Sequence, residues 1–484
     1  MLGFITNHSY IDSPTFRGMR WHLMQTFDSI YILDLHGNSK KKEVSPDGSK
    51  DVNVFDIMQG VAVVIGVKKK PKKGGKARVG PGKIFHAELW GTRKKKYASL
   101  QGAKLTSISW RELDPDPKYQ MFYPINRKLL DAYDNGFDLG KFMPTNQIGF
   151  QSHRDKFAVA FDKADVDARL ADMKNAAISN LDFRKKYGIK AKSAWPSVAQ
   201  RTDVAANFEL SERITECDYR PFDRRICILD EAVMDRPRWS ILKNCLSPEG
   251  FALNFVRQTK SVAWQHGIVS KFPAPAVFVE IKDGSNFAPL YIYEGIDQTR
   301  RINFDPKIYK QLQASAKHPK HGTPDEVQTF DFIYGVLHCP AYRTTFAEFL
   351  KIDFPRIPWP ATPDEFWDIS AKGMTLRKLH LMDPITIGDT PYQFKGQGDG
   401  TVEKTEFRDA RVWINATQYF DNAPQVSWGL FIGGYQPAQK WLKDRTGRKL
   451  DLSDVRHYQR ILKILFETFQ ITQTITMKLE SPSS

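Results

Sequence analysis

Arginine and lysine side chains recur beside aromatic rings in several loop-like stretches of the sequence. Two such clusters are Arg220-Pro221-Phe222-Asp223-Arg224-Arg225 and Arg236-Pro237-Arg238-Trp239, and a third runs from Tyr435 to Arg445. Cationic side chains in loops bind phosphate oxygens, and a few reach guanine edges. For any one residue, ordinary packing against a carboxylate is the simpler explanation, so the collection is better evidence than any member. The candidate nucleic-acid contacts are Arg154, Lys156, Arg220, Arg224, Arg225, Arg236, Arg238, Arg257, Lys440, Lys443 and Arg445.

The charge balance of the 484-residue chain supports the same interpretation. Its 71 lysines and arginines against 55 aspartates and glutamates give a net charge of +16, which attracts polyanions. A lysine-rich run from Lys68 to Lys76 is either a phosphate contact or a solubilising linker, and a second basic cluster spans Arg93 to Lys96. Nucleic acid is therefore the expected partner.

The sequence lacks the signature motifs of several enzyme classes. There is no G-x-x-x-x-G-K-[ST] phosphate loop, no H-E-x-x-H zinc helix and no G-x-S-x-G elbow, so we assign no catalytic residue. The four cysteines, Cys217, Cys227, Cys245 and Cys339, fall in no zinc-like spacing. We expect buried thiols and no metal site.

No membrane or export segment is expected. The longest apolar run, Gly60 to Val67, is far shorter than the roughly 20 residues that cross a bilayer. The amino terminus has no positive stretch followed by a long apolar region, so it does not read as a secretory signal. We therefore expect a cytoplasmic protein.

The amino-terminal part of the sequence has an alternating pattern of predicted strands and helix. Gly3–Thr6 reads as the end of a buried strand, Phe16–Phe27 as a helix, and Ile30–Leu35 and Gly60–Val67 as two further strands. Continuous apolar runs are typical of strands covered on both faces, as in a doubly wound α/β sheet. Only about three strands are available, fewer than such sheets usually have. The pattern therefore looks like the end of a domain.

Asp114-Pro115-Asp116-Pro117 marks a probable boundary, because closely spaced prolines disfavour helix and sheet pairing. Beyond it the composition predicts a mixed α+β region. The predicted helices are Asp162–Tyr187, Val327–Leu350, Pro363–Leu381 and Ser453–Ile471, and the predicted short strands are Ala276–Val279 and Leu290–Tyr293.

Ordered blocks of sequence carry a family resemblance. Four of them are Gly3–Tyr10 (GFITNHSY), Phe16–Arg20, Tyr31–Asn38 (YILDLHGN), and Asn53–Ile57 followed by Gly60–Val63. Further blocks are Pro144–Gly149, Asp218–Asp223, Phe332–His338, Phe349–Pro358 and Gly433–Leu442. The chain resembles the carboxy-terminal part of the large single-chain restriction-modification enzymes of type ISP and the related type IIG group. In these enzymes nuclease, helicase (in the ISP members), methyltransferase and target-recognition regions follow one another.

This resemblance implies a fold class and a domain order. Residues 1–113 would be the carboxy-terminal remainder of a doubly wound, Rossmann-like DNA adenine-N6 methyltransferase sheet. Residues 114–215 would be a connector and the start of the specificity region, and residues 216–484 a mixed α/β target-recognition domain. Gly3–Tyr10 would hold the fifth-strand motif, Tyr31–Leu35 the sixth strand and Val61–Val67 the seventh.

The family binds S-adenosylmethionine through a glycine-containing motif and catalyses through Asn-Pro-Pro-Tyr or Asn-Pro-Pro-Phe. Neither motif occurs in this sequence, and the family order places both upstream of Met1. S-adenosylmethionine would thus be the cofactor of the intact enzyme and would not bind tightly to this chain. We expect the chain alone to transfer no methyl group.

By resemblance, Phe55 matches the aromatic residue that stacks on the flipped adenine. Asn7, His8, Ser9 and Tyr10 would line the pocket wall at the carboxyl end of a strand. The alternatives are that Phe55 is a core aromatic and that His8, as a lone histidine, is structural.

The expected function is sequence-specific binding of double-stranded DNA, as the specificity portion of an adenine-N6 methyltransferase. Three situations remain open. The first is loss of the upstream half from the gene product. The second is a separate amino-terminal chain that assembles with this one, and the third is a stand-alone nucleic-acid-binding protein.

Overall fold

The computed structural model describes residues 1–39, 43–69, 80–206, 208–261, 263–295 and 297–479. They divide into two compact units, the first formed mainly by Met1–Ala132 and the second by Tyr133–Thr259 with Ala263–Leu479. The predicted boundaries after residues 113 and 215 stay predictions. No helix in the described part of the chain is long and apolar enough to cross a membrane.

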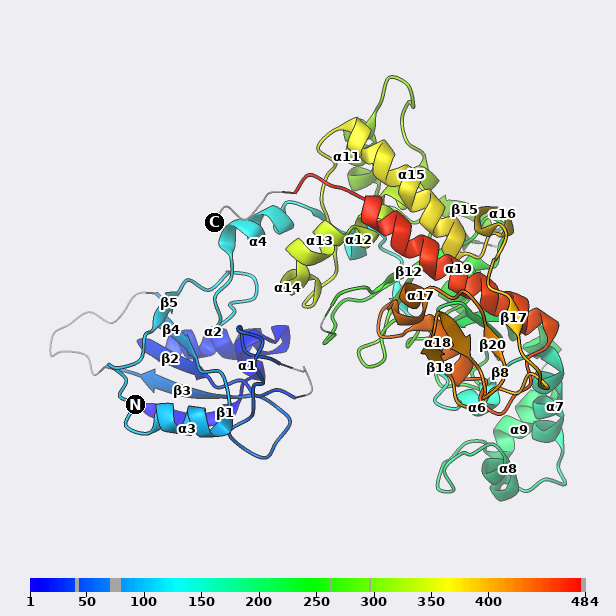
Figure 1. Cartoon of the computed structure of the whole chain (residues 1–484), viewed down its shortest axis with the longest axis horizontal. Coiled ribbons are helices and arrows are strands. Elements are labelled where there is room, and N and C mark those ends of the chain that lie inside the picture. The colour runs from blue at the N-terminus through cyan, green and yellow to red at the C-terminus, as the bar shows by residue number, and fades with distance from the viewer. Residues whose placement is uncertain (40–42, 70–79, 207, 262, 296, 480–484) are drawn as a thin grey trace. The chain divides into compact units, whose positions relative to one another are not determined.

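The first unit is built on one five-stranded sheet (Figure 1). Its strands lie in the order β1-β3-β2-β4-β5, and only the β2–β4 pair is parallel. In chain order its elements are β1 (Leu2–Asn7), α1 (Ser9–Asp12), η1 (Pro14–Phe16), α2 (Arg17–Thr26), β2 (Ser29–Asp34), β3 (Val61–Val67), β4 (Lys83–Glu88), α3 (Arg93–Leu100), β5 (Arg111–Leu113) and the start of α4 (Arg127–Asp134).

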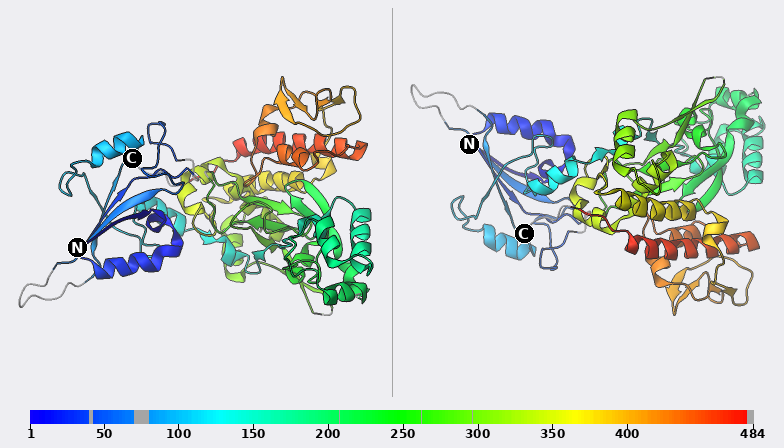
Figure 2. Two further views of the ribbon diagram at one scale, coloured as in Figure 1. Left: turned by 90° about the horizontal axis from the view of Figure 1, so that it is seen from below. Right: turned by 90° about the horizontal axis from the view of Figure 1, so that it is seen from above.

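Alternation along β2 sends side chains to both faces of this sheet. Ile30 and Ile32 pack in a core cluster with Met24 of α2. Leu33 belongs to a second cluster, against which Leu100 of α3 packs. Helices α2 and α3 thus cover opposite faces, as the blue and light-blue ribbons in Figures 1 and 2 show.

The predicted helix and the three predicted strands of this unit are confirmed, with one correction. β1 is not a buried strand: Leu2, Phe4 and Ile5 are each more than 40% exposed. The reason is its position, since β1 pairs with β3 on one side and stands at the end of the sheet. The estimate of about three strands was also too low, because the polar residues of β4 interrupt its apolar run and β5 has only three residues.

The second unit holds five small sheets and a group of helices. The sheets have the strand orders β8-β10-β9, β12-β11-β13-β7, β14-β15, β16-β6 and β17-β20-β19-β18. Its elements in chain order are β6 (Phe137–Asp138), α5 (Leu139–Phe142), β7 (Gln147–Ile148), α6 (Asp155–Ala158), β8 (Val159–Ala160), α7 (Lys163–Lys174), α8 (Asn180–Lys186), α9 (Val198–Ala206), η2 (Phe208–Arg213), β9 (Ile214–Arg220), β10 (Asp223–Ile228), α10 (Trp239–Leu242), η3 (Lys243–Cys245), β11 (Ala252–Phe255), β12 (Gly267–Ser270), β13 (Asn286–Pro289), β14 (Tyr291–Glu294), β15 (Thr299–Ile302), α11 (Pro306–Ala316), α12 (Glu326–His338), α13 (Pro340–Thr345), α14 (Ala347–Leu350), β16 (Arg356–Ile357), α15 (Pro363–His380), α16 (Pro384–Ile387), β17 (Phe394–Lys395), β18 (Glu406–Arg408), β19 (Arg411–Trp413), β20 (Tyr419–Phe420), α17 (Gln425–Gly429), α18 (Pro437–Lys443) and α19 (Leu452–Thr474).

Helices α12, α15 and α19 form the helical core of this unit (Figure 2). All residues of α12 from Thr329 to His338 are buried, and the four free cysteines are buried as predicted. The predicted helices 363–381 and 453–471 are confirmed as α15 and α19, whereas 162–187 and 327–350 each break into shorter helices. The predicted strand 276–279 is wrong: this segment is a turn and bend.

Candidate functional site

Phe55 lies in an irregular segment between β2 and β3, which we call the Phe55 loop (residues 53–59). The ring is 40% exposed, while Asn53 and Val54 just before it are buried. A ring this exposed is not a core aromatic, so the packing alternative does not hold. Its stacking on a base stays a prediction.

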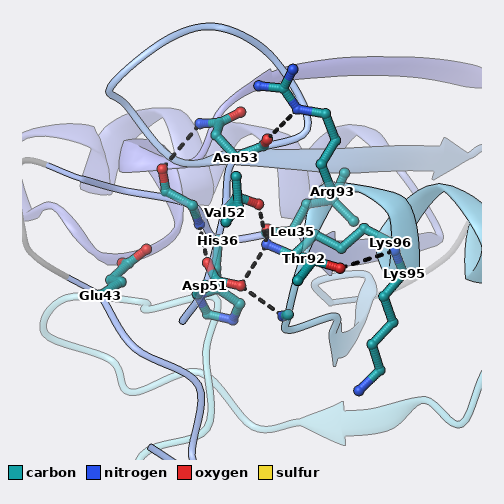
Figure 3. A network of polar contacts seen from close by, with 12 residues as sticks. Leu35, His36, Glu43, Asp51, Val52, Asn53, Thr92, Arg93, Lys95 and Lys96 are labelled. Atoms are coloured by element: carbon teal, nitrogen blue, oxygen red, sulfur yellow. Dashed lines mark hydrogen bonds and ion pairs between the residues drawn. The ribbon is translucent and has the colours of Figure 1, made fainter. Parts of the chain in front are cut away.

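The Phe55 loop is closed by one amide side chain. Asn53 Nδ2 donates to Gln59 O (2.6 Å) and to Gly37 O (3.2 Å), and Asn53 Oδ1 accepts from Phe55 N (2.9 Å). One side chain therefore joins both ends of the loop to the turn after β2. Figure 3 shows Asn53 between this turn and Arg93. Asn53 was not among the predicted site residues, although an asparagine that bonds to the amide two residues further on is a known local signal.

The four predicted wall residues at the end of β1 divide into two pairs. Asn7 is exposed and Ser9 partly so, and Asn7 Oδ1 accepts from both Ser9 N (2.8 Å) and Ser9 Oγ (2.6 Å). His8 and Tyr10 are buried, at 4% and 5% exposure. Only Asn7 and Ser9 therefore present polar atoms at the surface.

His8 belongs to a buried polar network around Asp34. His8 Nδ1 donates to Asp34 Oδ1 (3.0 Å), the His36 amide donates to the same oxygen (2.9 Å), and His36 Nδ1 lies 3.7 Å from Asp34 Oδ2. Burial acts to raise the pKa of Asp34, but the His8 hydrogen bond and the charge of His36 outweigh it and lower that pKa. The carboxylate ties the end of β1 to the end of β2.

These three side chains have the chemistry of metal ligands, since one donor atom from each lies within 4.8 Å of the others. The Asn38 amide also donates to His8 Nε2 (3.2 Å). The hydrogen bonds account for the cluster as it stands, and the expectation of no metal stays a prediction.

Several of the predicted nucleic-acid contacts are held by internal carboxylates. Arg225 lies 2.7 Å from Asp223 and 3.2 Å from Asp444, and Arg445 lies 3.1 Å from Asp223. The side chains of Arg225 and Arg445 are 11% and 6% exposed. Asp223 thus joins β10 to the end of α18, a contact across more than 200 residues that a sequence pattern does not reveal.

The remaining predicted contacts range from buried to exposed. Arg154 forms an ion pair with Asp235, and Lys440 forms one with Asp444. Arg224 lies 3.8 Å from Asp218. Arg220 is buried, with its guanidinium over the Tyr219 ring. Arg238 is half-buried. The exposed members are Lys156, Arg236, Arg257 and Lys443, of which Arg257 lies 3.1 Å from Asp353.

Of the two lysine clusters in the first unit, only Arg93–Lys96 lies wholly within the described residues. Most of the 68–76 run, from residue 70 onward, lies outside the described residues. In the Arg93–Lys96 cluster, Lys96 is completely buried. A basic run on a helix is therefore not a uniform charged face.

Comparisons with known proteins bear on both units. Residues 141–474 match the family model of the Type ISP C-terminal specificity domain. No curated protein sequence matches the chain.

The fold of this chain is similar to that of several solved structures, including the following three. The first is the ATP-dependent Type ISP restriction-modification enzyme LlaBIII bound to DNA, with a TM-score of 0.71 and 18% identity over 99% of this chain and 33% of that one. The second is a DrdV–DNA complex, with a TM-score of 0.69 and 19% identity over 98% of this chain and 50% of that one. The third is a nuclease-deletion mutant of the Type ISP enzyme LlaGI in complex with a DNA substrate mimic, with a TM-score of 0.67 and 18% identity over 99% of this chain and 39% of that one. At these identities the likeness is one of fold. The chain spans between a third and a half of the length of these structures.

Proposed function

The chain belongs to the Type ISP C-terminal specificity domain family, and from this membership we propose that it recognises a short sequence in double-stranded DNA for a restriction-modification enzyme. The observation that carries the proposal is the family match over residues 141–474. The three similar structures, each described as an enzyme with DNA or a DNA mimic, support it.

Within the second unit, the exposed cations are the best candidates for DNA contact. Lys156, Arg236, Arg257 and Lys443 expose their side chains, whereas Arg225 and Arg445 are committed to buried carboxylates. Cations that reach phosphates position a protein on the duplex, and a few polar groups at base edges supply the sequence preference.

The first unit, in this proposal, is the end of an adenine-N6 methyltransferase sheet. Two observations favour it. One edge of β1 has no neighbour among the described strands, and the Phe55 ring stands exposed beyond the ends of β2 and β3. The missing strands and the catalytic Asn-Pro-Pro-Tyr motif would come from residues outside this chain.

The residues present do not fit S-adenosylmethionine by themselves. The turn after β1 places a buried histidine beside Asp34, and the Gly37 amide after β2 is already bonded to Asp51 (2.6 Å). The described amides of His36, Gly37 and Asn38 after β2 donate to Asp34, Asp51 and Glu43, so they are not available to a carboxylate or ribose. We therefore expect the cofactor to bind only when a methyltransferase half is supplied.

A two-part measurement tests the function. The purified chain should bind duplex DNA with an affinity that falls steeply as salt rises, because bound cations release counterions. The same sample should transfer no label from S-adenosylmethionine to DNA. Salt-independent binding would contradict DNA recognition, and robust methyl transfer by the chain alone would contradict the division of labour between two halves.

A further inference from the structure

Four consecutive backbone carbonyls at the start of the Phe55 loop accept hydrogen bonds from side chains of one helix. Lys96 Nζ donates to Val52 O (2.9 Å), Arg93 Nε to Asn53 O (2.9 Å), Tyr97 Oη to Val54 O (2.6 Å) and an Arg93 guanidinium nitrogen to Phe55 O (2.9 Å). All three donors belong to α3. Figure 3 shows Arg93 and Lys96 reaching from this helix to the segment.

The centre of this arrangement is a buried ion pair. Lys96 Nζ lies 2.6 Å from Asp51 Oδ1, and both side chains are fully buried. The third ammonium hydrogen is used as well, since Lys96 Nζ also donates to Leu35 O (2.7 Å). Asp51 in turn accepts from the amides of Gly37 (2.6 Å) and Gly91 (2.8 Å). A buried lysine with every donor satisfied fixes the positions of the three segments that it joins.

Helix spacing explains how one short helix makes these contacts. Arg93, Lys96 and Tyr97 stand at i, i+3 and i+4, which places them on one face of α3. Lys94 and Lys95 lie between them and are exposed. The cap residue Thr92 accepts from Lys95 N (3.3 Å), which sets where the helix begins.

We propose that Arg93, Lys96 and Tyr97 form a carbonyl clamp that positions Phe55 to stack on a base, an inference that rests on the proposed function. Residues 53–59 have no helix or strand of their own, so without such bonds an exposed ring at this place would sample many orientations. The clamp fixes the backbone on both sides of the Phe55 side chain before any base arrives. That ordering lowers the entropic cost of binding the base.

The clamp residues act through Phe55 and are positioning residues. The Arg93 guanidinium is already bonded to two loop carbonyls and lies 2.7 Å from Asp56, so phosphate binding is not its main contact. Asn53 completes the loop from the other side by bonding to Gln59 O.

The first test needs only the chain itself. Tyr97→Phe removes one hydroxyl and keeps the ring, Arg93→Gln removes the guanidinium, and Lys94→Gln on the exposed side of α3 is the matched control. By hydrogen-exchange mass spectrometry, the hydrogen-bonded amides of Val52 and Phe55 should exchange about threefold to tenfold faster in the first two variants, the factor expected when the segment loses one hydrogen bond of ordinary strength. Thermal melts check that each variant is folded. Unchanged exchange in a folded Tyr97→Phe chain would overturn the clamp.

The second test combines this chain with a methyltransferase half and uses plasmid DNA that carries the site which the combination methylates. Tyr97→Phe and Arg93→Gln should lower kcat for labelled methyl transfer about threefold to tenfold and leave KM for DNA unchanged, as Phe55→Ala should do more severely. If Phe55→Ala lowers kcat and the clamp variants keep full activity, the clamp is overturned and the proposed function stands. If Phe55→Ala keeps full activity, the stacking role itself is wrong and the clamp has no catalytic purpose.

Discussion

At the scale of single residues, similar side chains in one short run have unlike environments. Among Arg93, Lys94, Lys95 and Lys96, one cation is fully buried, one is half-buried against backbone carbonyls and two face solvent. The sequence shows four adjacent positive charges and so predicts a charged patch. The i, i+3, i+4 spacing of Arg93, Lys96 and Tyr97 distinguishes the residues on the loop-facing side of α3 from the exposed lysines. This spacing is difficult to recognise within four adjacent positive charges.

The same distinction predicts different results for two arginines that the sequence grouped together. Arg236→Ala should weaken DNA binding and lower the slope of log affinity against log salt by about one unit, because Arg236 is exposed. Arg225→Ala should instead lower the melting temperature, because it leaves Asp223 buried with one partner fewer. Fluorescence anisotropy over a salt series, together with thermal melts, separates the two effects. Equal salt slopes in Arg236→Ala and the parent chain would remove Arg236 from the interface.

Asp34 gives the first unit a pH-dependent contribution to stability. Its pKa in the folded chain is lowered, so the stabilisation is fully present above the unfolded value near 4 and is lost as pH falls through the folded pKa. Asp34→Asn should lower the free energy of unfolding by about 2 kcal/mol at pH 7, since it weakens hydrogen bonds to a charged group. The difference between parent and variant should shrink below about pH 4. Denaturant melts from pH 7 to pH 3 measure it, and a difference that grows in acid would contradict the assignment.

At the scale of elements, helices α12 and α15 cross at two glycines. A Cβ on Gly373 would come 1.8 Å from Asp331 O, and one on Gly335 would come 2.6 Å from Ile369 O. The two backbones therefore approach more closely than any side chain at these positions permits. This close approach explains why a glycine occurs in the middle of each helix despite its poor helix propensity.

Gly373→Ala should accordingly destabilise the second unit by about 3 kcal/mol, the upper part of the usual range for an overpacked core. Gly429→Ala in α17 is the matched control, because a Cβ there meets no atom within 4 Å. Differential scanning calorimetry compares the two variants with the parent. A Gly373→Ala protein as stable as the control would mean that the helices can move apart at little cost.

The sequence predicted elements better than it predicted contacts. The long periodic helices 363–381 and 453–471 and the strands around Ile30 and Val63 were found because hydrophobic periodicity is a local property. The sequence did not predict the exposure of β1, the strands β4 and β5, or the ion pairs of Asp223, because these depend on which segments become neighbours. At the candidate site, Phe55 was identified by resemblance to the family. The α3 side chains that bond to its loop lie about 40 residues further along the chain, and no local sequence pattern links them to it.

At the scale of the whole molecule, the net charge of +16 and the internal ion pairs must be considered together. Arg225, Arg445 and Lys96 contribute to the formal charge but are neutralised by buried carboxylates. Long-range attraction to a polyanion therefore depends on the exposed cations, whose field is screened beyond about 8 Å at physiological salt.

The outer edge of β1 predicts a tendency of the chain to self-associate. Leu2, Phe4 and Ile5 are exposed on a strand whose outer edge has no neighbour among the described strands, and such an edge is a template for association with another copy of itself. We expect sedimentation velocity to show self-association that rises with concentration, and Phe4→Lys to suppress it. A chain that stays monomeric at high concentration would mean that this edge is protected. Pairing with another copy would occupy the edge at which the proposed function places further methyltransferase strands, so the two associations would exclude each other.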